Sequence, residues 1–209
     1  MITLIALHWM GPDKKERGLN AFRQNSSRAT KAKGFISRLA LESTTDSELW
    51  TTVTTWETMD DYNNFQNDPN KPKSDPNNPH FDKLERDVYE VNNTLTTMPN
   101  NTEGTSNKAV ALVALHWMGK EKFDRGMEAF KKNTADSKNA NGLISRMALK
   151  STTDPELWAT VTVWESIDHY NDFQNLPDRP KNNNATPLFD KVERDVYSVD
   201  ADLSLNWTG

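Results

Sequence analysis

The stretch Leu49–Phe65, "LWTTVTTWETMDDYNNF", contains two secondary-structure signals in direct succession. Its first half is rich in Trp, Thr and Val, and both Trp side chains fall on one face when alternate residues are counted, which predicts a strand. Thr58 is a favourable helix N-cap. Met59, Tyr62 and Phe65 then follow at a spacing of three, which predicts the apolar face of a helix. The stretch therefore predicts a strand that leads straight into a helix.

The same passage returns 108 positions later as "LWATVTVWESIDHYNDF", Leu157–Phe173. At this offset, residues 2–91 align with 110–199 without a gap, and 51 of the 90 pairs are identical. The chain is thus an internal duplication, with too few copies for a solenoid. A polar stretch with one Pro and one Gly lies between the copies and predicts a linker. We divide the chain into a first repeat (1–92), a linker (93–108), a second repeat (109–200) and a tail (201–209).

Each copy contains further elements around this passage. The expected order in the first copy is a strand at Ile2–His8, a helix from Asp13 to about Lys31, strands at 35–41 and 49–56, a helix from Met59, a Pro- and Asn-rich loop, a short helical piece from Phe81 and a last strand at Val88–Val91. Gly34 ends the first helix. The order is strand, helix, strand, strand, helix, strand.

This order predicts an α+β fold of the ferredoxin-like (βαββαβ) type, with a four-stranded antiparallel sheet and helices on one side. In a unit of about 90 residues the other face of the sheet is apolar and needs a cover, because large exposed apolar patches are rare. The second copy supplies that cover. We therefore predict two ferredoxin-like repeats packed sheet to sheet as an intrachain pseudo-dimer, a pseudo-dimeric α+β barrel. The sequence leaves open whether two such chains form a further homo-dimer.

Composition excludes several classes of protein. The formal net charge is −5 and Lys and Arg are scattered, so we expect no nucleic-acid partner. The absence of Cys excludes disulfides and thiolate metal sites and favours a reducing compartment. The apolar run Ile2–Leu7 is too short for a membrane span or a signal peptide, so we expect no membrane association and a cytoplasmic protein. No metal-ligand spacing and no Gly-rich phosphate loop occurs, so we expect neither metal nor bound cofactor.

Two residue types are candidates for catalysis because both copies keep them. His8 and His116 each follow an apolar strand, and a neutral His can act as a general base near pH 7. The alternative is a partly buried ring that bonds to backbone groups. Arg38 and Arg146 lie in mid-strand between apolar neighbours, where a charge is either paired or faces a cavity. Facing a cavity, Arg could bind an enolate or carboxylate oxygen; the alternative is a salt bridge, for example to Asp87.

The passages "TVTTWETMDDYNNF" and "TVTVWESIDHYNDF", with "FDKLERDVYEV" and "FDKVERDVYSV" downstream, resemble the antibiotic biosynthesis monooxygenases. The resemblance covers both copies. It implies the dimeric α/β-barrel fold of that family, here with the two subunits fused in tandem. The family includes oxygenases that act on aromatic polyketide intermediates without metal or flavin, haem-degrading enzymes, quinol-related enzymes and members without known activity.

Family positions can be transferred to this sequence residue by residue. The functional Trp of the family falls on Trp56 and Trp164, which would line an aromatic substrate cavity or, alternatively, belong to the core. Nearby aromatic residues on the second helix of each copy are candidates for the same wall: Tyr62, Tyr170, Phe65 and Phe173. The stretches that hold the haem-ligand His in other members contain none here, and His80, just before the first of them, has Leu188 as its counterpart. This departure counts against haem.

The resemblance implies a cofactor-independent monooxygenase that acts with O2 on a small aromatic or quinol-like molecule in an apolar barrel pocket. The His pair would be the base, the Arg pair would hold the substrate anion, and the Trp pair would form the walls. Two alternatives remain: a non-catalytic module that binds a small molecule or a protein, and a haem-binding or haem-degrading protein. Polar groups converging on an apolar cavity would favour an enzyme, whereas a filled barrel interior would favour a structural or interaction role.

Overall fold

The computed structural model describes residues 1–72, 75–97, 108–180 and 186–206. The first repeat contains β1 (Ile2–Trp9), α1 (Lys15–Ala29), β2 (Phe35–Ser43), β3 (Leu49–Trp56), α2 (Met59–Gln66) and β4 (Lys83–Val91). A short 3-10 helix, η1 (Asn93–Leu95), follows. The second repeat contains β5 (Val110–Trp117), α3 (Phe123–Lys138), β6 (Leu143–Ser151), β7 (Leu157–Trp164), α4 (Ile167–Gln174) and β8 (Lys191–Val199). No helix in these ranges is long and apolar enough to cross a membrane.

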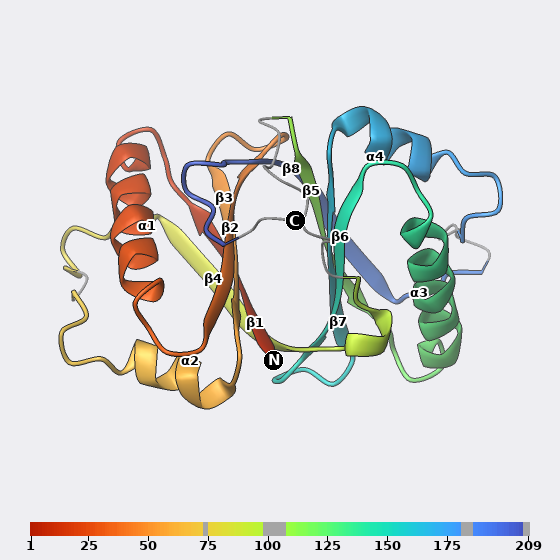
Figure 1. The fold of residues 1–209 in the computed structure, drawn as a ribbon, viewed down its shortest axis with the longest axis horizontal. Helices are drawn as coiled ribbons and strands as arrows, with labels where there is room; N and C mark the ends of the chain where they lie inside the picture. Colours follow the sequence, from red (N-terminus) through yellow and green to blue (C-terminus); the bar gives the residue numbers. More distant parts are fainter. Residues whose placement is uncertain (73–74, 98–107, 181–185, 207–209) are drawn as a thin grey trace.

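The strands form one closed antiparallel barrel in the order β1-β3-β2-β8-β5-β7-β6-β4, which confirms the predicted pseudo-dimeric barrel. The two repeats join at two seams. At one, β2 pairs with β8, and at the other, β4 pairs with β6. Figure 1 shows α1 and α2 on one outer side of the barrel and α3 and α4 on the opposite side. Each sheet therefore has one face toward the other repeat and one face toward its own helices.

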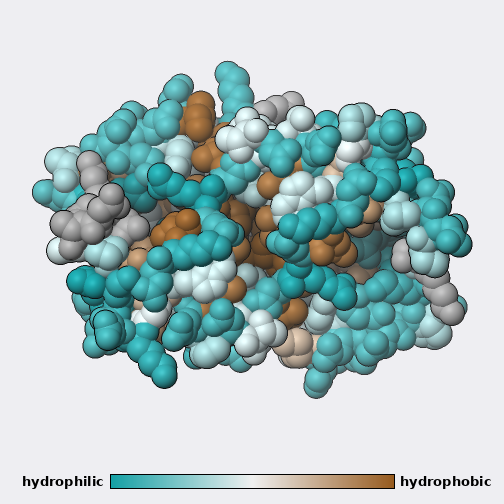
Figure 2. All heavy atoms as spheres, turned by 180° about the vertical axis from the view of Figure 1, so that it is seen from behind, coloured by the Kyte–Doolittle hydropathy of each residue, from teal (hydrophilic) through white to brown (hydrophobic). Residues whose placement is uncertain are grey.

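The interior of the barrel is a packed hydrophobic core. Ile5, Leu39 and Val53 from the first repeat meet Val113 and Val161 from the second, all at most 5% exposed. Eight strands enclose a space just wide enough for side chains to fill. From behind, apolar residues gather near the middle of the molecule and hydrophilic residues cover the helical flanks (Figure 2). A ligand cavity must therefore lie elsewhere.

The helix α2 begins at the N-cap that the sequence predicts. The Oγ1 atom of Thr58 accepts a hydrogen bond from the backbone N–H of Asp61, and Ser166 caps α4 in the same way with His169. Gly34, between α1 and β2, has φ +74, a left-handed conformation that glycine adopts without strain. These features hold α2 across the outer face of β3.

The last strand is longer than predicted. Where we expected a short helical piece from Phe81 and a strand only at Val88–Val91, β4 runs over Lys83–Val91 and pairs with the whole of β1, from Trp9↔Lys83 to Ile2↔Glu90. The expectation was wrong because a full-length neighbouring strand outweighs the weak helical signal of this polar segment.

Segments that the sequence assigns to the linker and the tail also pack on the barrel. In residues 92–97, the first strap, Leu95 is buried against the second repeat and Thr97 pairs with Arg146. In residues 200–205, the second strap, Leu203 is buried against the first repeat and Leu205 pairs with Arg38. Each strap crosses to the repeat that it does not follow in sequence. The straps are also 108 positions apart, so structural equivalence continues beyond the aligned repeats.

Candidate active site

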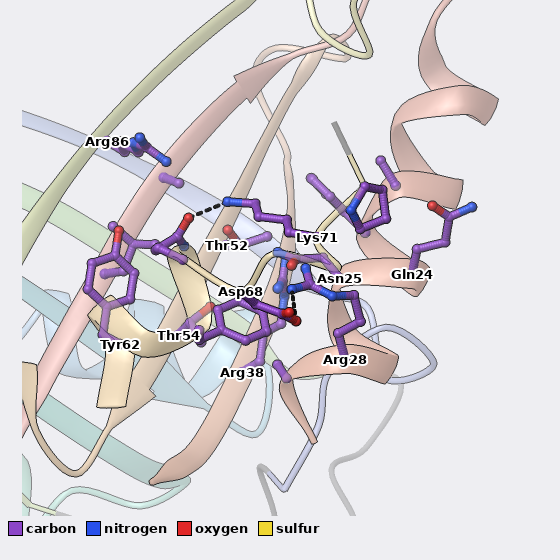
Figure 3. A pocket seen from close by; sticks show the side chains of 18 of the residues that line it. Gln24, Asn25, Arg28, Arg38, Thr52, Thr54, Tyr62, Asp68, Lys71 and Arg86 are labelled. Carbon is purple, nitrogen blue, oxygen red and sulfur yellow. Dashed lines mark hydrogen bonds and ion pairs between the residues drawn. The ribbon is translucent and has the colours of Figure 1, made fainter. Parts of the chain in front are cut away.

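A cavity of about 610 Å³ lies between the outer face of the first repeat's sheet and its helices, closed on one side by the loop after α2 (Figure 3). We expected an apolar pocket in the barrel, and this expectation was wrong about the place. The barrel interior is filled by side chains from both repeats, so open space is left on the helical side of the sheet. The walls are both aromatic and charged.

Every first-repeat candidate from the sequence lines this cavity: His8, Arg38, Trp56, Tyr62 and Phe65. Trp56 is 1% exposed, and its ring centroid lies 4.9 Å from that of Phe65 and 6.3 Å from that of Tyr62. The same three residues belong to one hydrophobic cluster. Trp56 is therefore a core residue that also lines the cavity, and its role toward a substrate stays a prediction.

His8 is fixed at the floor of the cavity by three neighbours. Its Nε2 atom lies 3.2 Å from Oγ1 of Thr52, and its ring centroid lies 4.7 Å from that of Phe22 and 4.5 Å from that of Phe81. Nδ1 is buried and has no hydrogen-bond partner among the described residues. One ring nitrogen of the imidazole is therefore left unsatisfied by the protein.

Burial, and secondarily the charges of Arg38 and Arg86, lower the pKa of His8 to about 3. His116 has the equivalent environment: its Nε2 atom lies 3.3 Å from Oγ1 of Thr160, Nδ1 is unpartnered, and burial lowers its pKa to about 3 as well. Both imidazoles are neutral near pH 7.

Arg38 is a buried cation that lacks an acidic partner among the described residues. It is 3% exposed, its Nε atom has no hydrogen-bond acceptor, and its guanidinium carbon lies 5.7 Å from the ring centroid of Phe22. The salt bridge to Asp87 does not form; Asp87 instead accepts a hydrogen bond of 2.5 Å from Ser151 across the seam. Burial lowers the pKa of Arg38 to about 10, so the side chain stays charged near pH 7.

Arg146, the counterpart of Arg38, bonds within its own repeat. Its Nε atom donates to Oγ1 of Thr134 at 3.2 Å, and NH1 donates to Oγ1 of Thr162 at 3.0 Å. At the position equivalent to Thr134 the first repeat has Ser26, whose Oγ atom is buried without a partner. The two repeats thus hold the same buried charge, but among the described residues only the arginine of the second repeat donates to hydroxyl groups of its own repeat.

An arginine lies against the remaining candidates of the second repeat, which are Trp164, Tyr170 and Phe173. Arg179, on the loop after α4, lies 4.9 Å over the ring of Phe173 and donates to Asn133 at 3.2 Å and to Gln174. Trp164 is 1% and Phe173 4% exposed, and they belong to one hydrophobic cluster with Tyr170 packed against it. These contacts hold the loop after α4 against the aromatic residues of the second repeat.

The equivalent region of the first repeat also has an arginine over its phenylalanine, but this arginine comes from the helix α1 and not from the loop. Arg28, from α1, lies 4.8 Å over the ring of Phe65 and 3.0 Å from Oδ2 of Asp68. Lys71, the counterpart of Arg179, points into the cavity and donates to Gln66 (Figure 3). Sequence reasoning did not select Arg28 or Lys71, nor Arg86 on β4. A comparison of the copies could have found Arg28, because Asp136 stands at its place in the second repeat.

Two histidines line the cavity, since His80 joins His8 at its rim. Within the described residues, no group of three or more His, Asp or Glu side chains is arranged to hold a metal ion. The site is therefore built from an aromatic wall, a neutral His and several cations.

A family model described as antibiotic biosynthesis monooxygenase matches residues 1–71 and 110–179. A protein from Fusobacterium nucleatum designated a monooxygenase has a TM-score of 0.75 at 13% identity, over 100% of this chain and 95% of its own. One from Lactobacillus acidophilus with the same designation has a TM-score of 0.70 at 9% identity, over 100% and 96%. A haem-degrading enzyme from Listeria monocytogenes has a TM-score of 0.54 at 12% identity, over 95% and 99%. These identities show a common fold alone, and no curated protein matches the sequence.

Proposed function

Because the chain belongs to the antibiotic biosynthesis monooxygenase family, we propose that it uses O2 to oxygenate a small aromatic or quinol-like molecule in the cavity of the first repeat, without a bound cofactor. The observation that carries the proposal is the convergence of His8 and Arg38 on a cavity with aromatic walls. A few fixed polar groups in an otherwise apolar cavity are typical of small-molecule sites.

The chemistry assigns complementary roles to the two polar groups. A phenol or quinol must lose a proton before it readily gives an electron to O2. His8 would take this proton, although its low pKa makes it a weak base, because the positive charge of Arg38 would stabilise the anion as it forms. Electron transfer to O2 gives a radical pair, which combines to a hydroperoxide. Loss of water then leaves a carbonyl, so one oxygen atom enters the product, the other becomes water, and the substrate supplies all the electrons.

In this proposal the second repeat is a supporting half. Its cation, Arg146, has acceptors in Thr134 and Thr162, and Arg179, on the loop after α4, lies over the ring of Phe173. The catalytic role predicted for both members of each pair is therefore assigned only to His8 and Arg38.

The test is an oxygen-electrode assay on anthrones, quinols and naphthols with the intact chain and two matched variants. Arg38→Met is expected to lower turnover by about 10²-fold or more, as for loss of a group that stabilises an oxyanion. Arg146→Met is expected to keep turnover once thermal melting has shown it to be folded. Equal losses in the two variants would contradict a single site. Ligand binding without oxygen uptake on any substrate would instead support the non-catalytic binding module.

Haem binding is a second candidate because His80 lines the cavity and its Nδ1 atom has no hydrogen-bond partner among the described residues. Histidine is a common haem ligand. An absorbance titration with haem tests this candidate, with His80→Leu as the matched variant because Leu188 stands at the equivalent position. A saturable Soret shift that disappears in His80→Leu would favour haem; no shift in the intact chain would reject it.

A further inference from the structure

The cavity of the first repeat is lined by more positively charged side chains than negatively charged ones. Four cationic side chains line it, Arg28, Arg38, Lys71 and Arg86, against the single carboxylate of Asp68. Asp68 is taken up by Arg28, at 3.0 Å. Among the described residues, no ion pair joins a carboxylate to any of the other three cations. Arg38 is buried and Lys71 half-buried, so their unpaired positive charge is costly unless an anion binds there, whereas Arg86 is exposed to solvent.

Lys71 is the cation on which the repulsion from the others is clearest. Its ammonium group reaches across the cavity, toward the side where Arg86 lies, and donates to Gln66, a neutral acceptor (Figure 3). Burial, followed by the charges of Arg86 and Arg28, lowers the pKa of Lys71. A bound anion would remove that repulsion, because an opposite charge nearby favours the charged form of an amine.

The second repeat keeps cations at three of these positions, Arg146, Arg179 and Arg194, but it does not repeat the pair of Arg28 with Asp68. Asp136 stands where the first repeat has Arg28, and it pairs with Lys132 at 3.1 Å. Leu176 stands where the first repeat has Asp68. The repeats have therefore diverged in charge at the mouth of the cavity while keeping its aromatic residues.

We propose that the molecule bound in this cavity is an aromatic acid. Its flat ring system would lie against Phe22, Trp56 and Tyr62, and its carboxylate would bind Lys71 and Arg86. The inference rests on the proposed function, since it names the substrate class of the same site. In this arrangement Arg38, on the sheet, binds the anion that forms at the reacting hydroxyl. The carboxylate and the oxyanion of the substrate therefore have separate cationic partners.

Two ligands with the same ring and hydroxyl but different charge provide the test: 3-hydroxy-2-naphthoate and its carboxamide, titrated into the intact chain by isothermal calorimetry at pH 7. The acid is expected to bind at least about tenfold more tightly than the amide, because charge-assisted hydrogen bonds are stronger than neutral ones. The preference is expected to shrink at high salt, since the cavity is open to solvent at its mouth. The same comparison is made with acid and amide pairs of one and three rings.

Variants locate the preference. Lys71→Met and Arg86→Met are each expected to reduce the acid-to-amide ratio by about threefold or more while leaving amide affinity unchanged, because each removes one charge-assisted contact. Arg194→Met, the equivalent change at an exposed position of the second repeat, is the matched control and is expected to keep the ratio.

Each outcome decides the proposal. Equal affinity for acids and amides, no binding of any pair, or a preference that survives both Lys71→Met and Arg86→Met would overturn it. The failure of the inference is distinguishable from the failure of the proposed function. Oxygen uptake on neutral quinols without an acid preference would keep the function and reject the aromatic acid, whereas an acid preference without oxygen uptake would do the reverse.

Discussion

At the scale of single residues, a buried charge acquires its role from its immediate acceptors. Arg38 and Arg146 have the same place in equivalent strands, yet Arg146 donates to Thr134, whereas the Nε atom of Arg38 has no acceptor among the described residues. An arginine whose donors are satisfied by the protein stabilises a repeat. One whose donors are left free beside a cavity is available to a ligand, and its burial makes an anionic ligand more favourable.

The two buried histidines predict how stability depends on pH. Since the pKa of His8 and His116 in the folded chain lies at about 3 and that of an unfolded His at its ordinary value of 6.5, the unfolded chain binds more protons between these values. Stability should therefore rise with pH from about 3 to 6.5, and each His should contribute about 1 kcal/mol per pH unit in the middle of this range. The double variant His8→Gln and His116→Gln should flatten the dependence measured by urea unfolding at pH 4.5–6.5.

Carboxylates titrate in both proteins, so the informative quantity is the difference between the two slopes. Parallel slopes for the intact chain and the double variant would show that the histidines are not buried in the neutral form. A single substitution at either position should remove about half of the difference, because the two environments are alike.

At the scale of elements, the sequence predicts what is encoded locally. Residues 49–56 and the Thr58 cap hold both a strand and a helix start within a few neighbours, and both are confirmed. The extent of β4 depends on pairing with the whole of β1, so its own residues did not predict it. The cations at the cavity mouth were missed for a similar reason, since Arg28 and Lys71 are far apart in sequence and meet only when the loop after α2 folds back on α1.

The straps show how a segment without a strong signal can still stabilise the fold. Leu203 is 4% exposed and packs with Met10, Phe22 and Trp50 of the first repeat. Leu203→Ala should lower the free energy of unfolding by about 2–5 kcal/mol through lost burial and a residual cavity. Asp202→Ala, at an exposed neighbouring position, should change it by less than about 0.5 kcal/mol. Urea unfolding of the two variants tests this prediction. Equal changes in the free energy of unfolding would show that the packing of the second strap does not stabilise the fold.

At the scale of the whole molecule, the two seams are related by the same offset as the sequence. Leu41↔Val199 and Ser43↔Tyr197 at one seam correspond to Leu149↔Val91 and Ser151↔Tyr89 at the other. The middle pairs differ in charge: Glu42 faces Ser198, and Glu90 faces Lys150. Because the two repeats differ at these positions, neither seam places two Glu residues opposite one another, whereas two copies of the first repeat would do so at both seams.

A fragment of residues 1–97 makes this repulsion measurable. In its symmetric homo-dimer the same register would place Glu42 opposite Glu90 at both seams, and like charges directly opposite one another destabilise paired strands by about 0.2–1 kcal/mol. Glu42→Lys, which copies the residue at position 150, should tighten the dimer by about threefold, because two repulsive pairs become attractive ones while the ion pair of Glu42 with Lys15, at 2.8 Å, is lost. Sedimentation equilibrium measures the dissociation constants, and Glu16→Lys on the exposed side of α1 controls for net charge. High salt should reduce the gain, as expected for charges at the edge of a sheet. Equal dimerisation by the fragment and its Glu42→Lys variant would mean that the seams are held by their apolar and hydroxyl pairs alone, and that charge plays no part in matching the first repeat with the second.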